Sequence, residues 1–160
     1  MTAEPMTAKP VRLSQAEMTE LVLPNDANML GNILGGKVMH LVDLCGAIAA
    51  CRHCGHVAVT ASVDHMDFRY PVRIGELVIL KASVNRAFRT SMEVGVKVYS
   101  ESMLTGERRH TSSAYLTFVA LDERGQRIPV PPVLPETGDE KRRYDKAAAR
   151  REYRLSMRQV

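Results

Sequence analysis

One uninterrupted segment, residues 36–53, restricts the fold of this chain more than any other feature. The segment reads GKVMHLVDLCGAIAACRH; it contains no proline and is rich in leucine, methionine and alanine, which favour the α-helix. At 1.5 Å per residue, the predicted helix is roughly 27 Å long. Its apolar residues fall on nearly every face, and such a helix belongs in an interior rather than on a surface. The rest of the chain therefore has to cover this helix.

The sequence after this segment alternates between apolar and polar residues, which is the period of a β-strand. Four stretches show the pattern, at residues 57–63, 78–84, 92–98 and 114–120, and a fifth short strand is expected at about residues 18–23. The connections are too short for crossover helices, so the strands should pair antiparallel. The sequence predicts an α+β fold, in which a five-stranded antiparallel sheet is wrapped around one long central helix.

Composition indicates one globular domain. The 160 residues are 45% hydrophobic and 25% charged, and a chain of this length buries enough surface to fold without disulfide or metal staples. It shows neither a secretory signal nor a membrane-spanning stretch, and three cysteines do not make a disulfide framework. We expect a cytoplasmic protein with a flexible segment at 1–15, a domain at 16–135 and a basic, helical tail at 136–160.

The positive charge of the chain is confined to that tail. Residues 139–160 hold eight of the 22 basic and four of the 18 acidic residues, which accounts for the whole net charge of +4. We interpret the tail as a solvated helix with i,i+4 ion pairs. Nucleic-acid binding through it is disfavoured, because no aromatic or glycine-rich recognition motif accompanies it.

A helix that is apolar on all sides also has consequences for assembly. A single five-stranded sheet covers only part of such a helix, and a second subunit is the simplest cover for the remainder. We therefore expect a homo-oligomer, at least a dimer.

Asp43 is the first candidate for a functional residue, because it is the only ionisable group between His40 and Arg52. A lone buried carboxylate is costly unless it has a partner or a role. The alternatives are that Asp43 faces solvent on one polar stripe of the helix, or that it pairs with His40. Gly46 costs helix stability, which suggests that a strand or a ligand approaches the helix closely there.

The loop before the helix, residues 26–36, is the second candidate. It ends in Gly35 and Gly36, and the N-terminus of a helix offers unpaired N–H groups and the positive end of the helix dipole. Such a terminus can polarise a substrate oxygen, although glycines are also common in loops for conformational reasons alone. The loop does not match the phosphate-binding motif that ends in Lys-Ser or Lys-Thr.

Two further segments have the residue types of a binding site. Cys51, His53, Cys54 and His56 have the spacing of metal ligands, but no second ligand pair follows, so we expect no metal and instead a helix end with Cys51 packed inside and Gly55 as the cap. Redox chemistry is disfavoured because the βαβ context is missing. The connection at residues 88–91 presents a cation and two hydroxyl groups, which suit a phosphate but also an ordinary polar turn.

Together these segments resemble the hotdog-fold acyl-CoA thioesterases, in particular the short bacterial acyl-CoA hydrolases related to the brain-type cytosolic enzyme. The resemblance runs from about residue 16 to 135. It is carried by DANMLGNILGG at 26–36, MHLVD at 39–43, AACRH at 49–53, VTASVD at 59–64, FRYPV at 68–72, RTSMEV at 89–94 and AYLTFVALD at 114–122.

The resemblance implies a fold like the one expected above, with active sites at a dimer interface and a trimer of dimers as the common assembly. It implies that Asp43 is the essential carboxylate, that Asn28 comes from the other subunit, and that the Gly36 N–H binds the thioester carbonyl oxygen. It places Thr60 in the same cleft, and Arg89, Thr90 and Ser91 at the coenzyme A site. His40 stands at a variable position, and Leu34 and Leu41 stand where some relatives have aromatic residues.

The implied reaction is hydrolysis of acyl-CoA to a fatty acid and coenzyme A, with no cofactor beyond the coenzyme A of the substrate. Asp43 would act either as a general base on water or as a nucleophile that forms a mixed anhydride. Two alternatives stay open. One is a hotdog dehydratase, which is disfavoured because no histidine matches its arrangement, and the other is a non-catalytic acyl-CoA sensor.

Overall fold

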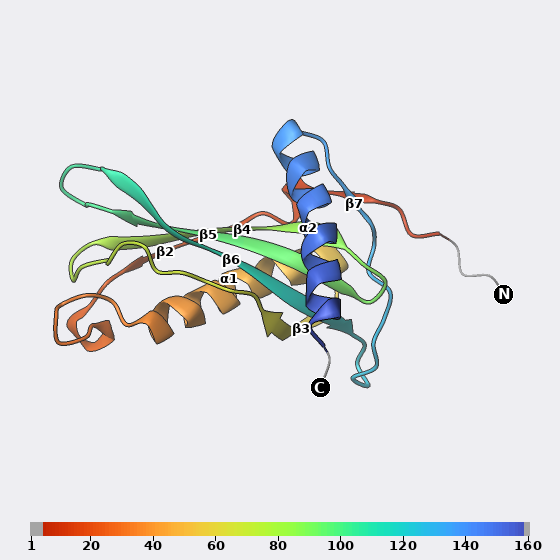
Figure 1. Ribbon diagram of the computed structural model, residues 1–160, viewed down its shortest axis with the longest axis horizontal. Coiled ribbons are helices and arrows are strands. Elements are labelled where there is room, and N and C mark those ends of the chain that lie inside the picture. The colour runs from red at the N-terminus through yellow and green to blue at the C-terminus, as the bar shows by residue number, and fades with distance from the viewer. Residues whose placement is uncertain (1–4, 159–160) are drawn as a thin grey trace.

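The computed structural model describes residues 5–158, and its core is one antiparallel sheet (Figure 1). Five strands lie in the order β2, β4, β5, β6, β3. Their bounds are Ala16–Leu21 for β2, Val57–Val63 for β3, Leu77–Ala87 for β4, Ser91–Glu101 for β5 and Arg108–Leu121 for β6. Two helices accompany the sheet, α1 at Gly35–Cys54 and α2 at Gly138–Ser156. Neither is long and apolar enough to cross a membrane, within the described part of the chain.

The predicted fold class is confirmed, and the differences lie at the ends of the elements. The helix expected at 36–53 is α1, and the strand expected at 57–63 is β3. The first strand lies two residues earlier than expected, because β2 pairs with β4 from Ala16 to Leu21 and the chain then turns. The other strands extend beyond their apolar cores, and β6 reaches 14 residues. Alternation of apolar and polar residues identifies only the part of a strand that packs against a core. The polar ends of the strand continue the same hydrogen-bonded ladder, and this pattern does not show them.

Helix α1 packs along the concave face of the sheet, and Gly46 allows the helix to approach the strands closely. A Cβ atom built on Gly46 would lie 3.2 Å and 3.3 Å from two ring atoms of Phe118 on β6, and 3.7 Å from Val96 on β5. Gly46, Phe118 and Val96 are all buried. The approach expected at this glycine is therefore that of a strand.

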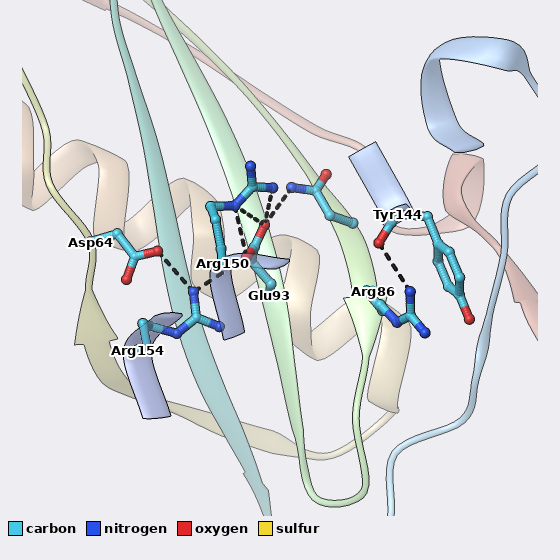
Figure 2. A network of polar contacts seen from close by, with 7 residues as sticks. Asp64, Arg86, Glu93, Tyr144, Arg150 and Arg154 are labelled. Atoms are coloured by element: carbon cyan, nitrogen blue, oxygen red, sulfur yellow. Dashed lines mark hydrogen bonds and ion pairs between the residues drawn. The ribbon is translucent and has the colours of Figure 1, made fainter. Parts of the chain in front are cut away.

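Helix α2 covers the opposite face of the sheet, so the sheet lies between the two helices (Figure 1). Thr137 caps its start by accepting a hydrogen bond from the Glu140 N–H. The tail is a helix and most of its residues are exposed, but the expectation of a wholly solvated helix with i,i+4 pairs is wrong, because one face packs on the sheet. Arg150 and Arg154 reach down to Glu93, whose side chain is fully buried on β5 (Figure 2). The one ion pair within the helix, among the described residues, joins Arg142 to Asp139 at i,i+3.

A small parallel pair of strands joins the two ends of the domain. Strand β1, Lys9–Pro10, pairs with β7, Val133–Leu134. The Lys9 ammonium donates hydrogen bonds to the carbonyl oxygens of Arg52 and His53 at the C-terminal end of α1, where a positive charge complements the helix dipole. The segment before β2 therefore holds the end of the central helix.

We expect Gly46→Val to destabilise the protein, because its methyl groups would overlap the Phe118 ring. Overpacking of this kind costs about 1–3 kcal/mol, so the thermal midpoint should fall by several degrees at equal protein concentration. Gly138→Val is the matched control, since nothing lies within 4 Å of a Cβ atom there. Equal midpoints for the two variants would show that α1 does not depend on this close contact.

Candidate active site

Asp43 and Thr60 form the centre of the candidate site. Asp43 lies in the middle of α1 and is half-buried, and Thr60 lies on the edge strand β3. The Thr60 hydroxyl donates a hydrogen bond to Oδ1 of Asp43, with 2.5 Å between the oxygen atoms. This bond orients the carboxylate and leaves its other oxygen, Oδ2, free of protein donors among the described residues. The structure thus brings together two residues that are 17 positions apart in the sequence.

The exposed face of α1 around Asp43 is mostly apolar and includes His40 as a polar residue, and Asp43 itself is half-buried rather than directed fully into solvent. Met39, Leu44 and Ile48 are 46%, 42% and 38% exposed. Leu44 and Ile48 have the i,i+4 spacing of one helix face, and Met39 lies four residues before Asp43 on the adjoining row. On β3, the neighbouring strand, Val57 and Val59 are 63% and 42% exposed. A single carboxylate therefore stands within an apolar surface that one protomer leaves uncovered.

The N-terminus of α1 supplies a second group of polar atoms. Leu34 is its N-cap residue but has no side chain that can cap it. The Leu34 carbonyl accepts hydrogen bonds from the N–H groups of Lys37 and Val38. Among residues 5–158 no acceptor engages the Gly36 N–H, and a Cβ atom on Gly36 would meet nothing within 4 Å. The Gly36 N–H is thus an accessible donor at the positive end of the helix dipole.

Asn28 lies in the loop before α1 and organises that loop. Its Oδ1 accepts hydrogen bonds from the N–H groups of Leu30 and Asn32 at 3.0 and 3.1 Å. Its backbone N–H donates to the Asn32 carbonyl at 2.8 Å, and its carbonyl accepts from Gly31. The amide oxygen of Asn28 is therefore used within the loop, and its Nδ2 group is the part available to a ligand. Asn28 can act toward a substrate as a donor.

The candidate residues of one protomer fall into two groups that are separated along the helix. Gly36 and Asn28 lie at its N-terminal end, whereas Asp43 lies seven residues further on, which is roughly 10 Å along the axis. That separation is too large for Gly36 and Asp43 of one chain to contact the same carbonyl group. The structure brings Asp43 together with Thr60 but not with Asn28 or Gly36.

A cavity of about 360 Å³ adjoins the N-terminal group. Its lining includes Asn28, Gly35, Val38, Phe68, Tyr70 and Thr111. The ring of Phe68 lies 3.6 Å from the place of a Cβ atom on Gly35, and the guanidinium group of Arg109 stacks on Tyr70 at 4.7 Å. The sequence did not assign Phe68 or Tyr70 to the site, although both lie in FRYPV at 68–72, one of the segments that carry the family resemblance.

Arg89 and Thr90 lie in the connection between β4 and β5, and Ser91 is the first residue of β5. The Arg89 carbonyl accepts from the Val130 N–H and the Thr90 carbonyl accepts from the Ala120 N–H, so the backbone of the turn is fixed. Ser91 is paired with Val119 on β6, and Val119 is paired with Val59 on β3. The turn therefore lies two strands, or about 10 Å, from the segment that carries Thr60.

The cysteine and histidine motif at the end of α1 does not converge on one point. His53 and Cys54 are buried, whereas Cys51 and His56 are exposed. The expectation that Cys51 packs inside is wrong, because position 51 continues the exposed stripe of α1. Gly55 caps the helix with φ +70°, as expected. No three potential metal ligands come together within the described residues.

Burial changes the proton affinity of several groups near this end of α1. It raises the pKa of the Cys45 thiol to about 11 and also raises the pKa of the Cys54 thiol. It lowers the pKa of His53, although a hydrogen bond between Nε2 and the Pro131 carbonyl at 2.7 Å opposes that effect. Because Nε2 carries the donated proton, Nδ1 is unprotonated, and it has no partner among the described residues. His53 is a neutral structural residue.

The comparisons with known proteins show the family of this chain. A family described as the thioesterase superfamily matches residues 30–107. The uncharacterized acyl-CoA thioester hydrolase YkhA of Bacillus subtilis is 43% identical over 127 residues, which are 79% of this chain and 74% of that protein. The chain belongs to the thioesterase superfamily, and its relatives within that family are acyl-CoA thioesterases and hydrolases.

Longer relatives and solved structures extend the comparison. Acyl-coenzyme A thioesterase 11 of Mus musculus is 41% identical over 91% of this chain, but the chain spans only 25% of its length. An apo-hexameric acyl-CoA thioesterase is 45% identical with a TM-score of 0.91, covering 94% of this chain and 97% of the other. The Staphylococcus aureus acyl-CoA hydrolase, solved with butyryl coenzyme A, coenzyme A and coenzyme A disulfide, is 36% identical with a TM-score of 0.89, covering 94% and 92%. That hydrolase has also been solved with Asp→Ala, Asn→Ala and Thr→Ala substitutions.

We expect His53 to make stability depend on pH below neutrality. Its pKa is lowered by folding, so the unfolded chain binds a proton at a pH where the folded chain does not. The stabilisation is complete above the ordinary pKa of about 6.5 and is lost as the pH falls below it, by up to about 1.4 kcal/mol per pH unit. The measurement is the denaturant midpoint between neutral pH and about pH 5. His53→Gln should flatten this dependence, whereas His56→Gln, a substitution of an exposed residue, should leave it unchanged, and the same slope in all three proteins would contradict the assignment.

Proposed function

We propose that this chain hydrolyses acyl-CoA thioesters to a carboxylic acid and coenzyme A. The single observation that carries the proposal is the pairing of Asp43 with Thr60 in the middle of an exposed apolar stripe. A carboxylate there can be desolvated and oriented when the stripe is covered, and it can then act on a water molecule beside an acyl group. The relatives support the substrate class, since the Staphylococcus aureus hydrolase was solved with butyryl coenzyme A.

The proposed active site is composite. Asp43 and Thr60 of one protomer face Asn28 and Gly36 of its partner, because the two groups are too far apart within one chain to reach one carbonyl. The apolar stripe of α1 and the exposed valines of β3 support this arrangement, since they provide a surface for a second copy. Strand β3 has a partner on one side only among the described residues, so its free edge is available for pairing. A trimer of such dimers is the further assembly we propose, following the hexameric relative.

In the proposed reaction the thioester carbonyl oxygen accepts hydrogen bonds from the Gly36 N–H and from Nδ2 of Asn28. These donors, with the helix dipole, stabilise the negative charge that develops on this oxygen; one such donor contributes about 2.7–4 kcal/mol. Asp43, held by Thr60, removes a proton from water, and the oxygen of that water bonds to the carbonyl carbon. The carbon–sulfur bond then breaks, the thiolate takes up a proton, and the acid leaves. In the alternative route, Asp43 itself attacks and water opens the anhydride.

The reaction as proposed uses water and side chains of this protein, and coenzyme A enters as part of the substrate. Arg89, Thr90 and Ser91 are the proposed contacts to coenzyme A, in a turn whose backbone is fixed by bonds to β6 and to Val130. A cytoplasmic location is part of the same proposal. The free thiols of Cys45, Cys51 and Cys54 support a reducing compartment.

We expect the wild-type protein to release thiol from acyl-CoA esters, and Asp43→Asn to lose at least about a hundredfold in kcat while it still binds coenzyme A. The reason is that the amide cannot accept the proton of water, and acid–base residues contribute about 10²–10⁴ to rates. The assay is thiol release from a panel of esters of increasing chain length, with Asp145→Asn as a control on an exposed residue of α2. If the wild type binds coenzyme A and hydrolyses none of the esters, the sensor alternative replaces the enzyme.

A composite site can be tested by mixing inactive variants. When Asp43→Asn and Asn28→Ala chains are unfolded and refolded together, half of the dimers contain one chain of each kind. Every mixed dimer then has one site with both substitutions and one with neither, so about a quarter of the wild-type activity should return. If all four residues acted within one chain, the mixture would remain inactive.

A further inference from the structure

The buried ionic network under α2 fixes the position of this helix on the sheet. Figure 2 shows Arg150 and Arg154 pointing from α2 toward Glu93 and Asp64. Arg150 donates to both Glu93 oxygens at distances between 2.6 and 3.1 Å, and Asn85 Nδ2 donates to Oε1 at 3.0 Å. Arg154 donates to Asp64 at 2.8 Å. Glu93 is fully buried, and removal of one partner of a buried ion pair is costly, so α2 is held in one place.

The same network decides which positive charges of α2 remain without a partner. Burial acts to lower the pKa of Arg150, but its bonds to Glu93 outweigh that effect and the pKa is raised. Arg150 and Arg154 are both neutralised by carboxylates. Arg151 lies between them in the sequence, and it forms no ion pair among the described residues. Its i±3 and i±4 neighbours are three apolar residues and one arginine, so no carboxylate of the helix itself reaches it.

Arg151 is directed at the turn between β4 and β5. Its guanidinium group stacks on the ring of Phe88 at 4.3 Å, and its Nη1 lies 3.5 Å from the Ser91 hydroxyl, at the limit of a hydrogen bond. The side chain is half-buried, so the stack orients it without using up its donors. These contacts place an unpaired planar cation beside the turn that carries Arg89.

We infer that Arg151 is a phosphate-binding residue of the coenzyme A site, supplied by the C-terminal helix. Arg89 and Arg151 thus place two cations at one turn, and neither has a carboxylate partner among the described residues. A guanidinium group binds phosphate oxygens in pairs, and coenzyme A carries a diphosphate and a 3′-phosphate. The inference rests on the proposed function. It also gives the basic tail a role. That tail forms α2, which lies outside residues 30–107 that the family model matches.

The test compares substrates that carry the same acyl group with and without the phosphates. For Arg151→Gln we expect KM for acyl-CoA to rise about tenfold or more, as for the loss of one hydrogen-bonded charge, with kcat unchanged within about twofold. KM for the corresponding acyl-pantetheine should not change. An acyl ester of dephospho-coenzyme A separates the two phosphate groups: if KM for it is also unchanged by the substitution, Arg151 binds the 3′-phosphate, and otherwise it binds the diphosphate.

The controls separate binding from folding. Arg142→Gln removes the same charge from the same helix at a side chain that is 55% exposed, and it should leave KM for acyl-CoA unchanged. Arg151→Lys, which keeps the charge but loses the planar pair of donors, should give an intermediate KM. The denaturant midpoint of each variant shows whether α2 stays docked.

Three outcomes would overturn the inference. They are an unchanged KM of Arg151→Gln for acyl-CoA, an equal rise for acyl-CoA and acyl-pantetheine, and an effect of Arg142→Gln as large as that of Arg151→Gln. Absence of hydrolysis in the wild type would instead overturn the proposed function. In that case calorimetric titration with coenzyme A alone decides the inference, since Arg151→Gln should still bind it about tenfold more weakly than the wild type does.

Discussion

The packing of α1 against the concave face of the sheet is the contact on which the rest of the structure depends. Gly46 lets the helix approach Phe118 until only van der Waals separation remains, and this fixes how far the middle of α1 stands from the strands. That distance sets the reach from Asp43 to Thr60 across the gap between helix and edge strand. If a side chain at position 46 held the helix further from the sheet, the Thr60 hydroxyl would no longer reach Asp43. The position of the carboxylate therefore depends on a residue that has no side chain.

The two helices are held on the two faces of the sheet by different interactions. Against α1 the contact is apolar and its geometry is set by close packing, as at Gly46 and Phe118. Against α2 it is ionic, through Glu93, Arg150 and Arg154, and a buried ion pair has far stricter geometry than an apolar contact. Figure 2 shows how this network reaches the end of β3 through Asp64, so one helix holds both the edge strand and the middle of the sheet.

Local sequence patterns were sufficient for most of the fold and for only part of the candidate site. Alternating residues identified four strands, and composition identified α1, because both depend on neighbours in the sequence. The carboxylate of Asp43 stood out for the same reason, as the one charge in an apolar segment. Its partner Thr60 came only from a family resemblance. Glu93 occupies an ordinary polar position in an alternating strand, and its partner Arg150 lies 57 residues away, so no local pattern connects them. The sequence indicated that the sheet leaves part of α1 uncovered but not which face, because a helix that is apolar on all sides offers no pattern that distinguishes one face from another.

The dependence of Glu93 on Arg150 also has a consequence for the order in which the chain is completed. A growing chain has all five strands of the sheet once β6 has been made, at residue 121. At that stage Glu93 has no counter-ion, since both arginines that bind it belong to α2. The carboxylate must stay hydrated until the helix emerges, so the outer face of the sheet cannot become dry before the last turns of α2 are synthesised. The outer face of the sheet is therefore completed only after α2 has been synthesised, and a chain that stops before residue 150 retains a charge it cannot bury.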